Sequence, residues 1–323
     1  MLVVRNLTIR FKTKKGLVTA VNNVSFNLQK GETLGVVGES GCGKSITNMA
    51  IMGLLPSEAI VQADELSFNG RDIRKLSAKE WQLLRSDHFG IIFQDPMSAL
   101  NPCFTVEYQI SEVIEKTNPG SSIERIRTKA IELLEKVGIP DPKKRLSCYP
   151  HELSGGMAQR VMIAMAIAGN PDVLIADEPT TALDVTIQLQ ILKLLKNLQR
   201  ENNMAILFVT HDLGVVSQIS DRIQVLYAGE IVETGNVKDV LTKPLHPYTK
   251  GLIKSLPKSN SSTDELYSIP GMVPALSKRP QGCQFSPRCD KVFDQCLHGS
   301  VNLSEINNRE VRCLLKHENE TNE

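Results

Sequence analysis

Residues 38–45 read Gly38-Glu39-Ser40-Gly41-Cys42-Gly43-Lys44-Ser45, and this stretch decides the fold. It matches the pattern G-x-x-x-x-G-K-[ST], in which a glycine-rich loop wraps the phosphates of a nucleotide. The apolar residues 33–37 before it predict a short buried strand, and residues 46–55 after it predict a helix. A strand, a glycine-rich loop and a helix in this order form the context that the pattern requires.

The residue types in this loop suit the binding of phosphate groups. Glycines let the backbone approach closely, so that successive N–H groups and the start of the following helix can surround negative charge. Lys44 is predicted to contact the β- and γ-phosphates as a point charge, and Ser45 to offer its hydroxyl to Mg²⁺. We therefore expect the chain to bind ATP or GTP.

Composition limits the class of protein. The 323 residues can bury a large core, and their formal net charge of +1 gives no global basic field for nucleic acid. No apolar run approaches the roughly 20 residues that span a bilayer, and the first residues lack a signal-peptide pattern. We expect a soluble chain of the cytosol.

The N-terminal residues 1–35 alternate as antiparallel strands do, with predicted turns at Gly16 and at Asn22-Asn23. Phe11 lies at the end of one of these strands, upstream of the phosphate loop. Its ring could stack on the base of the nucleotide, or it could equally be a core residue. Both interpretations stay open.

The middle of the chain predicts a strand that ends in a polar loop. Residues 89–93 are apolar, and Gln94 follows them at the carboxyl tip, where ligands bind in nucleotide-binding α/β sheets. Residues 106–138 have helical periodicity, interrupted by the turn-forming residues 118–122.

A second candidate anion site lies at Ser154-Gly155-Gly156, which opens a predicted helix that extends to Ala168. Bare N–H groups and the positive end of a helix dipole favour negative charge there. The economical explanation for two such sites is a dimer, in which this motif of one copy closes the nucleotide site of the other. By itself, the motif could also be a serine N-cap followed by a flexible glycine pair.

An apolar strand over residues 173–176 ends in two carboxylates, Asp177 and Glu178. Asp177 is predicted to hold Mg²⁺, directly or through water, and Glu178 to act as the general base on the attacking water. A turn at residues 181–184, a helix at 187–198 and a strand at 205–210 follow. His211, at the tip of that strand, could donate a hydrogen bond to the γ-phosphate.

Together these motifs resemble those of the nucleotide-binding subunits of ABC transporters, and they occur in the family's order over roughly residues 1–250. The resemblance implies an α/β fold with a phosphate-loop core sheet, an antiparallel β subdomain and a helical subdomain. It also implies ATP as the nucleotide, with Gln94 joining Ser45 and Asp177 around Mg²⁺. Glu178, His211 and Gln94 would be catalytic, and Asp184 would belong to the nucleotide site.

Three stretches narrow the resemblance to importers of di- and oligopeptides: residues 92–102, 151–157 and 245–249. This implies a second, non-identical ATPase subunit, two membrane-spanning permeases and an extracytoplasmic binding protein. It also implies a peripheral location on the cytoplasmic face of the cell membrane. Nickel or another solute remains an alternative cargo. Met157 stands where many signatures of the family carry Gln, at a position beyond the Ser-Gly-Gly phosphate contact.

Four of the seven cysteines gather near the C-terminus, at Cys283, Cys289, Cys296 and Cys313. Four thiolates can hold a [4Fe–4S] cluster or tetrahedral zinc, and spacings wider than those of structural zinc favour the cluster. The resemblance points the same way, since this subfamily ends in a cysteine-bearing extension, here residues 251–323. Four unrelated thiols are the remaining alternative. Residues 316–323 are polar and predicted to be disordered.

Two other functions fit the sequence less well than import does. A soluble ABC ATPase acting on nucleic acid or ribosomes usually carries two cassettes or long coiled-coil insertions, and this chain shows one cassette with neither. A redox-sensing regulator would not need a complete set of hydrolytic residues. The sequence therefore favours a transport ATPase.

Overall fold

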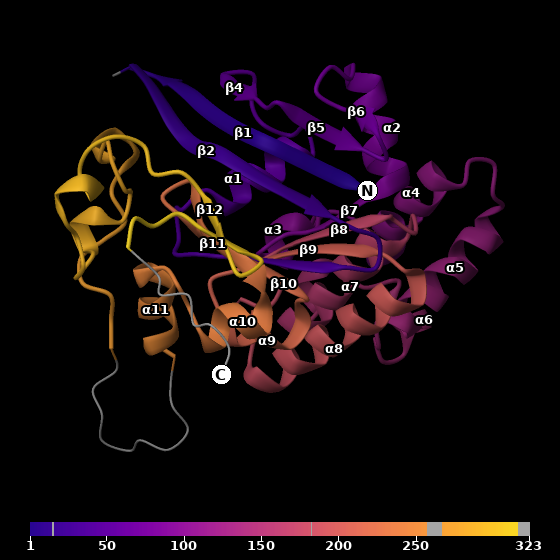
Figure 1. Ribbon diagram of the computed structural model, residues 1–323. Helices are drawn as coiled ribbons and strands as arrows, with labels where there is room; N and C mark the ends of the chain where they lie inside the picture. Colours follow the sequence, from indigo (N-terminus) through magenta and orange to yellow (C-terminus); the bar gives the residue numbers. More distant parts are fainter. Residues whose placement is uncertain (15, 182, 257–266, 316–323) are drawn as a thin grey trace. The chain divides into compact units, whose positions relative to one another are not determined.

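The computed structural model describes residues 1–14, 16–181, 183–256 and 267–315 (Figure 1). The predictions made for Ala182 and for residues 316–323 lie outside these ranges. The chain divides into two compact units. The first unit comprises Met1, Leu28–Thr33 and Ile73–Val209, and the second comprises Leu2–Asn27, Leu34–Asp72 and Thr210–Glu323.

The second unit contains an antiparallel sheet built from the N-terminal strands. Its strands are β1 (Leu2–Thr13), β2 (Gly16–Leu28), β4 (Ala59–Gln62), β5 (Glu65–Phe68) and β6 (Arg71–Asp72). Their order is β2-β1-β5-β6, and β4 also pairs with β1. Burial alternates at the start of β1, where Leu2 and Val4 are buried, and the alternation ends at Asn6, which has a φ of 51°.

The predicted turn at Asn22-Asn23 is wrong, because β2 runs through both residues. Asn23 has a positive φ of 49°, a conformation that asparagine tolerates better than most residues. Its N–H donates to the Thr8 hydroxyl across the sheet at 3.2 Å, and the Asn22 amide donates to the Glu230 carboxylate at 2.6 Å. These hydrogen bonds therefore hold both asparagines within β2, although the local sequence favours a turn at this position.

A second group of strands in this unit leads into the phosphate loop. Strand β3 (Thr33–Val37) pairs in parallel with β10 (Arg222–Tyr227), and β10 pairs antiparallel with β11 (Glu230–Asn236). The hairpin of β12 (Ser304–Ile306) and β13 (Arg309–Val311) adds to β11 (Figure 1). The C-terminal segment, residues 267–315, is therefore hydrogen-bonded into the same unit as the loop.

The helices of the second unit are short. They are α1 (Lys44–Ile51), α9 (Leu213–Ile219), α10 (Val237–Thr242), α11 (Pro247–Lys254) and the 3₁₀ turns η2 (Leu276–Lys278), η3 (Ser286–Arg288) and η4 (Asp294–Cys296). Helix α1 starts two residues before its predicted start and ends four residues before its predicted end. Gly53, at φ 61°, and Pro56 follow, and both disfavour a continuing helix.

The first unit holds three parallel strands in the order β7 (Phe89–Ile92), β8 (Val173–Asp177) and β9 (Ala205–Thr210). Strands β8 and β9 are almost wholly buried, which explains their continuous apolar sequence. The helices of this unit are α2 (Ala78–His88), α3 (Pro96–Ala99), α4 (Val106–Thr117), α5 (Ile123–Lys136), α6 (Pro142–Arg145), η1 (Pro150–Glu152), α7 (Gly155–Ile167) and α8 (Val185–Asn202).

The local sequence explains where these helices begin. Thr105, Ser122, Ser154 and Asp184 each cap a helix by accepting a backbone N–H from the first turn. The predicted α/β class is confirmed, and the apolar runs predicted as strands form β7, β8 and β9, with β7 ending at Ile92. No helix within the described ranges is both long and apolar enough to cross a membrane.

Candidate functional site: a phosphate loop and an acidic strand tip

The phosphate loop joins β3 to α1 in the second unit, and two of its glycines are required by geometry. A Cβ on Gly38 would lie 2.1 Å from the carbonyl oxygen of Leu226, so no side chain fits there. Gly43 has a φ of 108° and caps α1, a conformation that L side chains rarely adopt. The backbone can therefore turn tightly and leave the start of α1 open toward the loop.

Lys44 lies inside this loop. It is 6% exposed, and its Nζ donates to the carbonyl oxygens of Gly38 at 2.7 Å and Glu39 at 3.2 Å. Ser40, Gly41 and Ser45 are exposed, as groups that meet a ligand must be. The loop carbonyls thus hold the ammonium group in place, and its contact with phosphates stays a prediction.

Glu39, the second residue of the loop, is held by residues far along the chain. Arg288 forms a two-pronged ion pair with it, Nη1 to Oε2 at 2.7 Å and Nη2 to Oε1 at 3.0 Å. The N–H of Glu39 donates to the Tyr248 hydroxyl at 3.0 Å. Burial alone would lower the pKa of Arg288, but hydrogen bonds to Glu39 and Tyr227 outweigh it, and the pKa of Arg288 is raised.

A buried carboxylate fixes Tyr248 under the loop. Glu233 is fully buried and accepts the N–H groups of Leu245 and His246, both at 2.9 Å. The Nδ1 of His246 accepts the N–H of Tyr248 and caps α11. Burial raises the pKa of Glu233 and also that of Tyr248, which keeps the Tyr248 phenol protonated.

The acidic pair lies at the end of β8 in the first unit. Glu178 has a φ of 50°, and its N–H donates to the Val209 carbonyl at 2.8 Å. Its Oε2 accepts both Gln94 Nε2 at 3.1 Å and Thr181 Oγ1 at 3.0 Å. A left-handed glutamate is strained, and such strain persists at functional sites when the surroundings hold it. The structure thus brings Gln94 and Glu178 together, while sequence reasoning gave Thr181 no side-chain role.

Two predicted phosphate-contacting motifs begin helices of the first unit. Ser154 and Gly155 are exposed at the start of α7, where the Ser154 hydroxyl accepts the N–H of Met157 at 3.3 Å. Gly156 lies against the Ile187 side chain, and a Cβ added at Gly156 would be 3.2 Å from it. Asp184 is exposed and caps α8 by accepting the N–H of Ile187 at 2.9 Å. Both helix starts are therefore accessible to a ligand.

Three further candidates have defined positions. Asp177 is half-buried as the last residue of β8, beside Glu178. His211 is exposed and directly follows β9. Phe11 lies on β1 opposite Ala59 and is half-buried, so its ring is partly accessible. Their predicted roles in nucleotide chemistry stay predictions.

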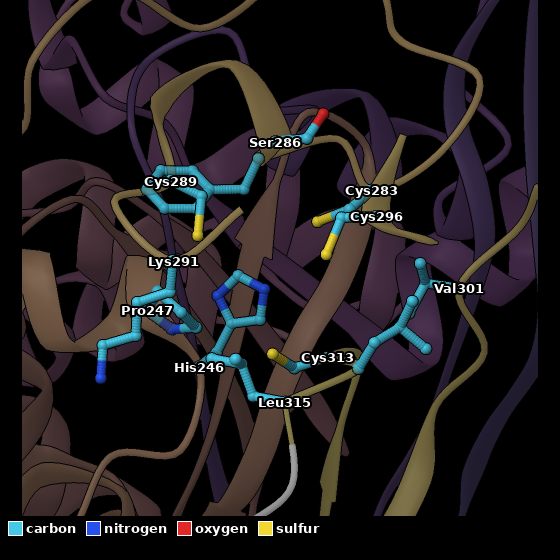
Figure 2. A pocket seen from close by; sticks show the side chains of 12 residues that line it. His246, Pro247, Cys283, Ser286, Cys289, Lys291, Cys296, Val301, Cys313 and Leu315 are labelled. Carbon is cyan, nitrogen blue, oxygen red and sulfur yellow. The ribbon is translucent and has the colours of Figure 1, made fainter. Parts of the chain in front are cut away.

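The four C-terminal cysteines line one cavity. Figure 2 shows the sulfurs of Cys283, Cys296 and Cys313 directed into it, with Cys289 on the opposite wall. Burial, followed by mutual repulsion among the thiolates, raises the pKa of Cys283 to about 11. The N–H of Cys283 donates to the carbonyl of Cys296 at 2.8 Å.

These cysteines do not form a ready-made ion site. Among the described residues, no group of three or more cysteine, histidine, aspartate or glutamate side chains is placed to hold a metal ion. The predicted iron–sulfur site is therefore not confirmed, although the four residues do meet at one cavity.

Sequence reasoning missed Arg288 and Tyr248. The sequence shows only an arginine between Pro287 and Cys289, and nothing in it indicates that this arginine is buried. Nor does the local sequence identify its partner as Glu39, which lies 249 positions away.

Comparisons with known proteins agree with this geometry. The family described as "ABC transporter" matches residues 21–181, and "Oligopeptide/dipeptide transporter, C-terminal region" matches residues 232–296. The "Dipeptide transport ATP-binding protein DppD" of Escherichia coli K12 is 49% identical over 296 residues, covering 92% of this chain and 90% of that protein. The "Oligopeptide transport ATP-binding protein OppD" of Bacillus subtilis 168 is 53% identical, covering 89% and 81%.

A solved structure is also similar. It is titled as the dimeric structure of a post-hydrolysis state of the ATP-binding cassette MJ0796 bound to ADP and Pi. It matches with a TM-score of 0.66 at 30% identity, covering 73% of this chain and 99% of that one.

Proposed function

The chain belongs to the ABC transporter family, and from that premise we propose that it is the ATPase subunit of a membrane importer of di- and oligopeptides. One observation carries the assignment of cargo: the likeness to dipeptide-transport ATPases spans about nine-tenths of the chain and includes a peptide-transporter C-terminal region. We propose residues 1–250 as the nucleotide-binding domain and residues 251–323 as a C-terminal extension.

The residues of the two motifs would divide the chemistry of ATP hydrolysis. Lys44 and the loop N–H groups would bind the phosphates, and Ser45, Asp177 and Gln94 would hold Mg²⁺. Mg²⁺, when bound, neutralises charge that develops on the phosphates. Glu178 takes a proton from the attacking water, with Gln94 and Thr181 fixing the carboxylate. His211 donates to the γ-phosphate.

We propose that the working form is a dimer with a second, non-identical ATPase subunit. The exposed start of α7, at Ser154 and Gly155, offers N–H groups and a positive dipole end to a phosphate on the partner. The MJ0796 cassette, which this chain resembles, is titled as a dimer with ADP and Pi.

Apolar surface near Gln94 supports binding to two membrane-spanning permeases. Phe93, Met97, Phe104 and Tyr108 are each at least 40% exposed, and Phe104 stacks on Tyr108 with ring centroids 4.4 Å apart. Exposed apolar patches of this kind mark protein contacts. Phe93 directly precedes Gln94 and the other three follow it, so permease contact and the acidic site can be coupled through one segment of the chain. The subunit would lie at the cytoplasmic face of the membrane, and an extracytoplasmic binding protein would deliver the peptide.

Peptide uptake in cells that lack this chain tests the assignment. We expect uptake of a radiolabelled dipeptide to fall to background and to return when the wild-type chain is supplied. Uptake of the free amino acid serves as the matched control and should not change. Unchanged dipeptide uptake, or loss of nickel uptake alone, would overturn the peptide assignment while leaving the ATPase intact.

We also propose that Cys283, Cys289, Cys296 and Cys313 bind a [4Fe–4S] cluster that orders the C-terminal segment. Four soft sulfur donors around one cavity fit such a group. The sequence spacings of the four cysteines are wider than those usual at structural zinc sites, which favours the cluster over zinc.

Replacing one of the four cysteines tests this site through the colour and the iron content of the purified protein. Anaerobically purified protein should be brown, with about four iron and four sulfide per chain. Cys313→Ser should lose the colour and the iron, because three thiolates hold the cluster poorly. Cys103→Ser, which changes an exposed cysteine outside the cavity, should keep both. Zinc without iron would contradict the cluster, and four freely alkylated thiols would contradict any metal.

A further inference from the structure

The phosphate loop contains a carboxylate that ought to oppose its function. Glu39 is the second residue of the loop, directly after Gly38, and its own carbonyl oxygen accepts a hydrogen bond from Lys44. A carboxylate several ångströms from bound phosphate repels it by an amount that matters at the low effective dielectric of a protein surface. Some other group must therefore neutralise this charge or hold it away.

Arg288 meets both requirements. Its guanidinium pairs with both oxygens of Glu39, the geometry that arginine matches best, and its side chain is 5% exposed. The guanidinium is itself fixed, because Nε donates to the Pro270 carbonyl at 2.8 Å and Nη2 to the Ile269 carbonyl at 3.2 Å. The carboxylate is thus held by a rigid partner, whose side chain loses little further conformational entropy when it forms this ion pair.

Aromatic packing adds to this rigidity. The guanidinium carbon of Arg288 lies 5.8 Å from the ring centroid of Tyr227 and 5.9 Å from that of Phe285. Tyr227 and Phe285 also contact each other, edge to face, with centroids 5.2 Å apart. Arg288 therefore packs against an aromatic cluster that joins β10 to the C-terminal segment, and its guanidinium contacts the loop from there.

We propose that Arg288 is a positioning residue of the nucleotide site, which neutralises Glu39 and holds its side chain so that the loop can accept phosphates. The C-terminal segment then contributes directly to nucleotide affinity, besides carrying the cysteine cavity. The inference rests on the proposed assignment of residues 38–45 to nucleotide binding, and it does not depend on what the cysteines hold.

A merely structural role would look different, and Arg279 provides the comparison. Arg279 also anchors the C-terminal segment, since it donates to the backbone carbonyls of Thr19 at 2.8 Å and Ala20 at 3.2 Å. Its loss would loosen the segment without exposing the Glu39 charge. Only the Arg288 defect should therefore depend on whether residue 39 carries a carboxylate.

A double-mutant cycle in the full-length chain makes the distinction. ATP affinity is measured by fluorescence titration for wild type, Arg288→Met, Glu39→Gln, the double variant and Arg279→Met. Methionine keeps a long apolar side chain at this position while removing the charge. We expect Arg288→Met to weaken ATP about tenfold at low salt and less at high salt, because the repulsion is screened. The double variant should bind within about threefold of wild type.

Each other outcome has a defined meaning. Equal weakening in Arg288→Met and in the double variant would overturn the inference, since removing the carboxylate would then restore nothing. Normal affinity in Arg288→Met would overturn it as well. If Arg288→Met fails to fold, Arg288→Lys keeps the charge and should show a smaller loss that Glu39→Gln again relieves; no relief would count against the inference. Absence of ATP binding by wild type would instead refute the proposed function.

Discussion

Replacement of Glu178 by glutamine is expected to leave ATP binding intact and to slow hydrolysis by about 10²- to 10⁴-fold. An amide cannot take the proton from the attacking water. Its oxygen can still accept the hydrogen bonds of Gln94 Nε2 and Thr181 Oγ1, so the local geometry should survive. The substitution thus removes proton acceptance while it keeps the shape of the site.

Steady-state phosphate release by the assembled transporter measures this effect, with nucleotide affinity determined in parallel. Glu201→Gln is a matched control, because it makes the same chemical change at an exposed carboxylate that pairs with Lys136 on the surface. The control should hydrolyse ATP at the wild-type rate. Turnover of Glu178→Gln close to wild type would show that Glu178 is not the base.

Replacement of Lys44 by alanine is expected to weaken ATP binding by about 10- to 100-fold, since hydrogen bonds to charged groups contribute roughly 1.5–3 kcal/mol. The lysine is buried in the loop, so the loss of its charge is poorly compensated by water. Its absence also frees the carbonyls of Gly38 and Glu39, which then face the phosphates as uncompensated negative dipoles.

Thermal unfolding with and without ATP measures this loss separately from any effect on the fold, because a ligand raises the unfolding temperature only to the extent that it binds. Lys44→Ala should lose most of the ATP-induced rise. Lys116→Ala, which removes an exposed lysine paired with Glu112 on α4, should keep the full rise. An unchanged rise in Lys44→Ala would mean that the loop does not bind phosphate as proposed.

Several elements of this fold could be predicted from short stretches of sequence. The pattern of residues 38–45 depends on glycines and a lysine within a few positions of each other, so the loop, its strand and its helix could be predicted together. The strands at 173–177 and 205–210 are buried on both faces and appear as continuous apolar runs. Helix starts at Ser154 and Asp184 follow from capping chemistry.

The failures also have physical causes. Asn22-Asn23 has turn chemistry, but hydrogen bonds to Thr8 and Glu230 hold both residues in β2. The side-chain role of Thr181 depends on the left-handed backbone at Glu178, which no local pattern specifies. For Asn22 and Asn23, tertiary contacts outweighed a local turn preference worth about 1 kcal/mol or less.

The glycine-rich loop, the acidic strand tip and the apolar strands of the first unit could be predicted from the sequence, because each depends on residues that are neighbours along the chain. Only the tertiary structure decided that Arg288 and Tyr248 hold Glu39, and that four cysteines line one cavity. Such contacts join residues up to 249 positions apart. These contacts form only when the strands of the second unit pair, and a charge that becomes buried must then find a partner of opposite sign. The spacing of residues along the chain encodes neither event.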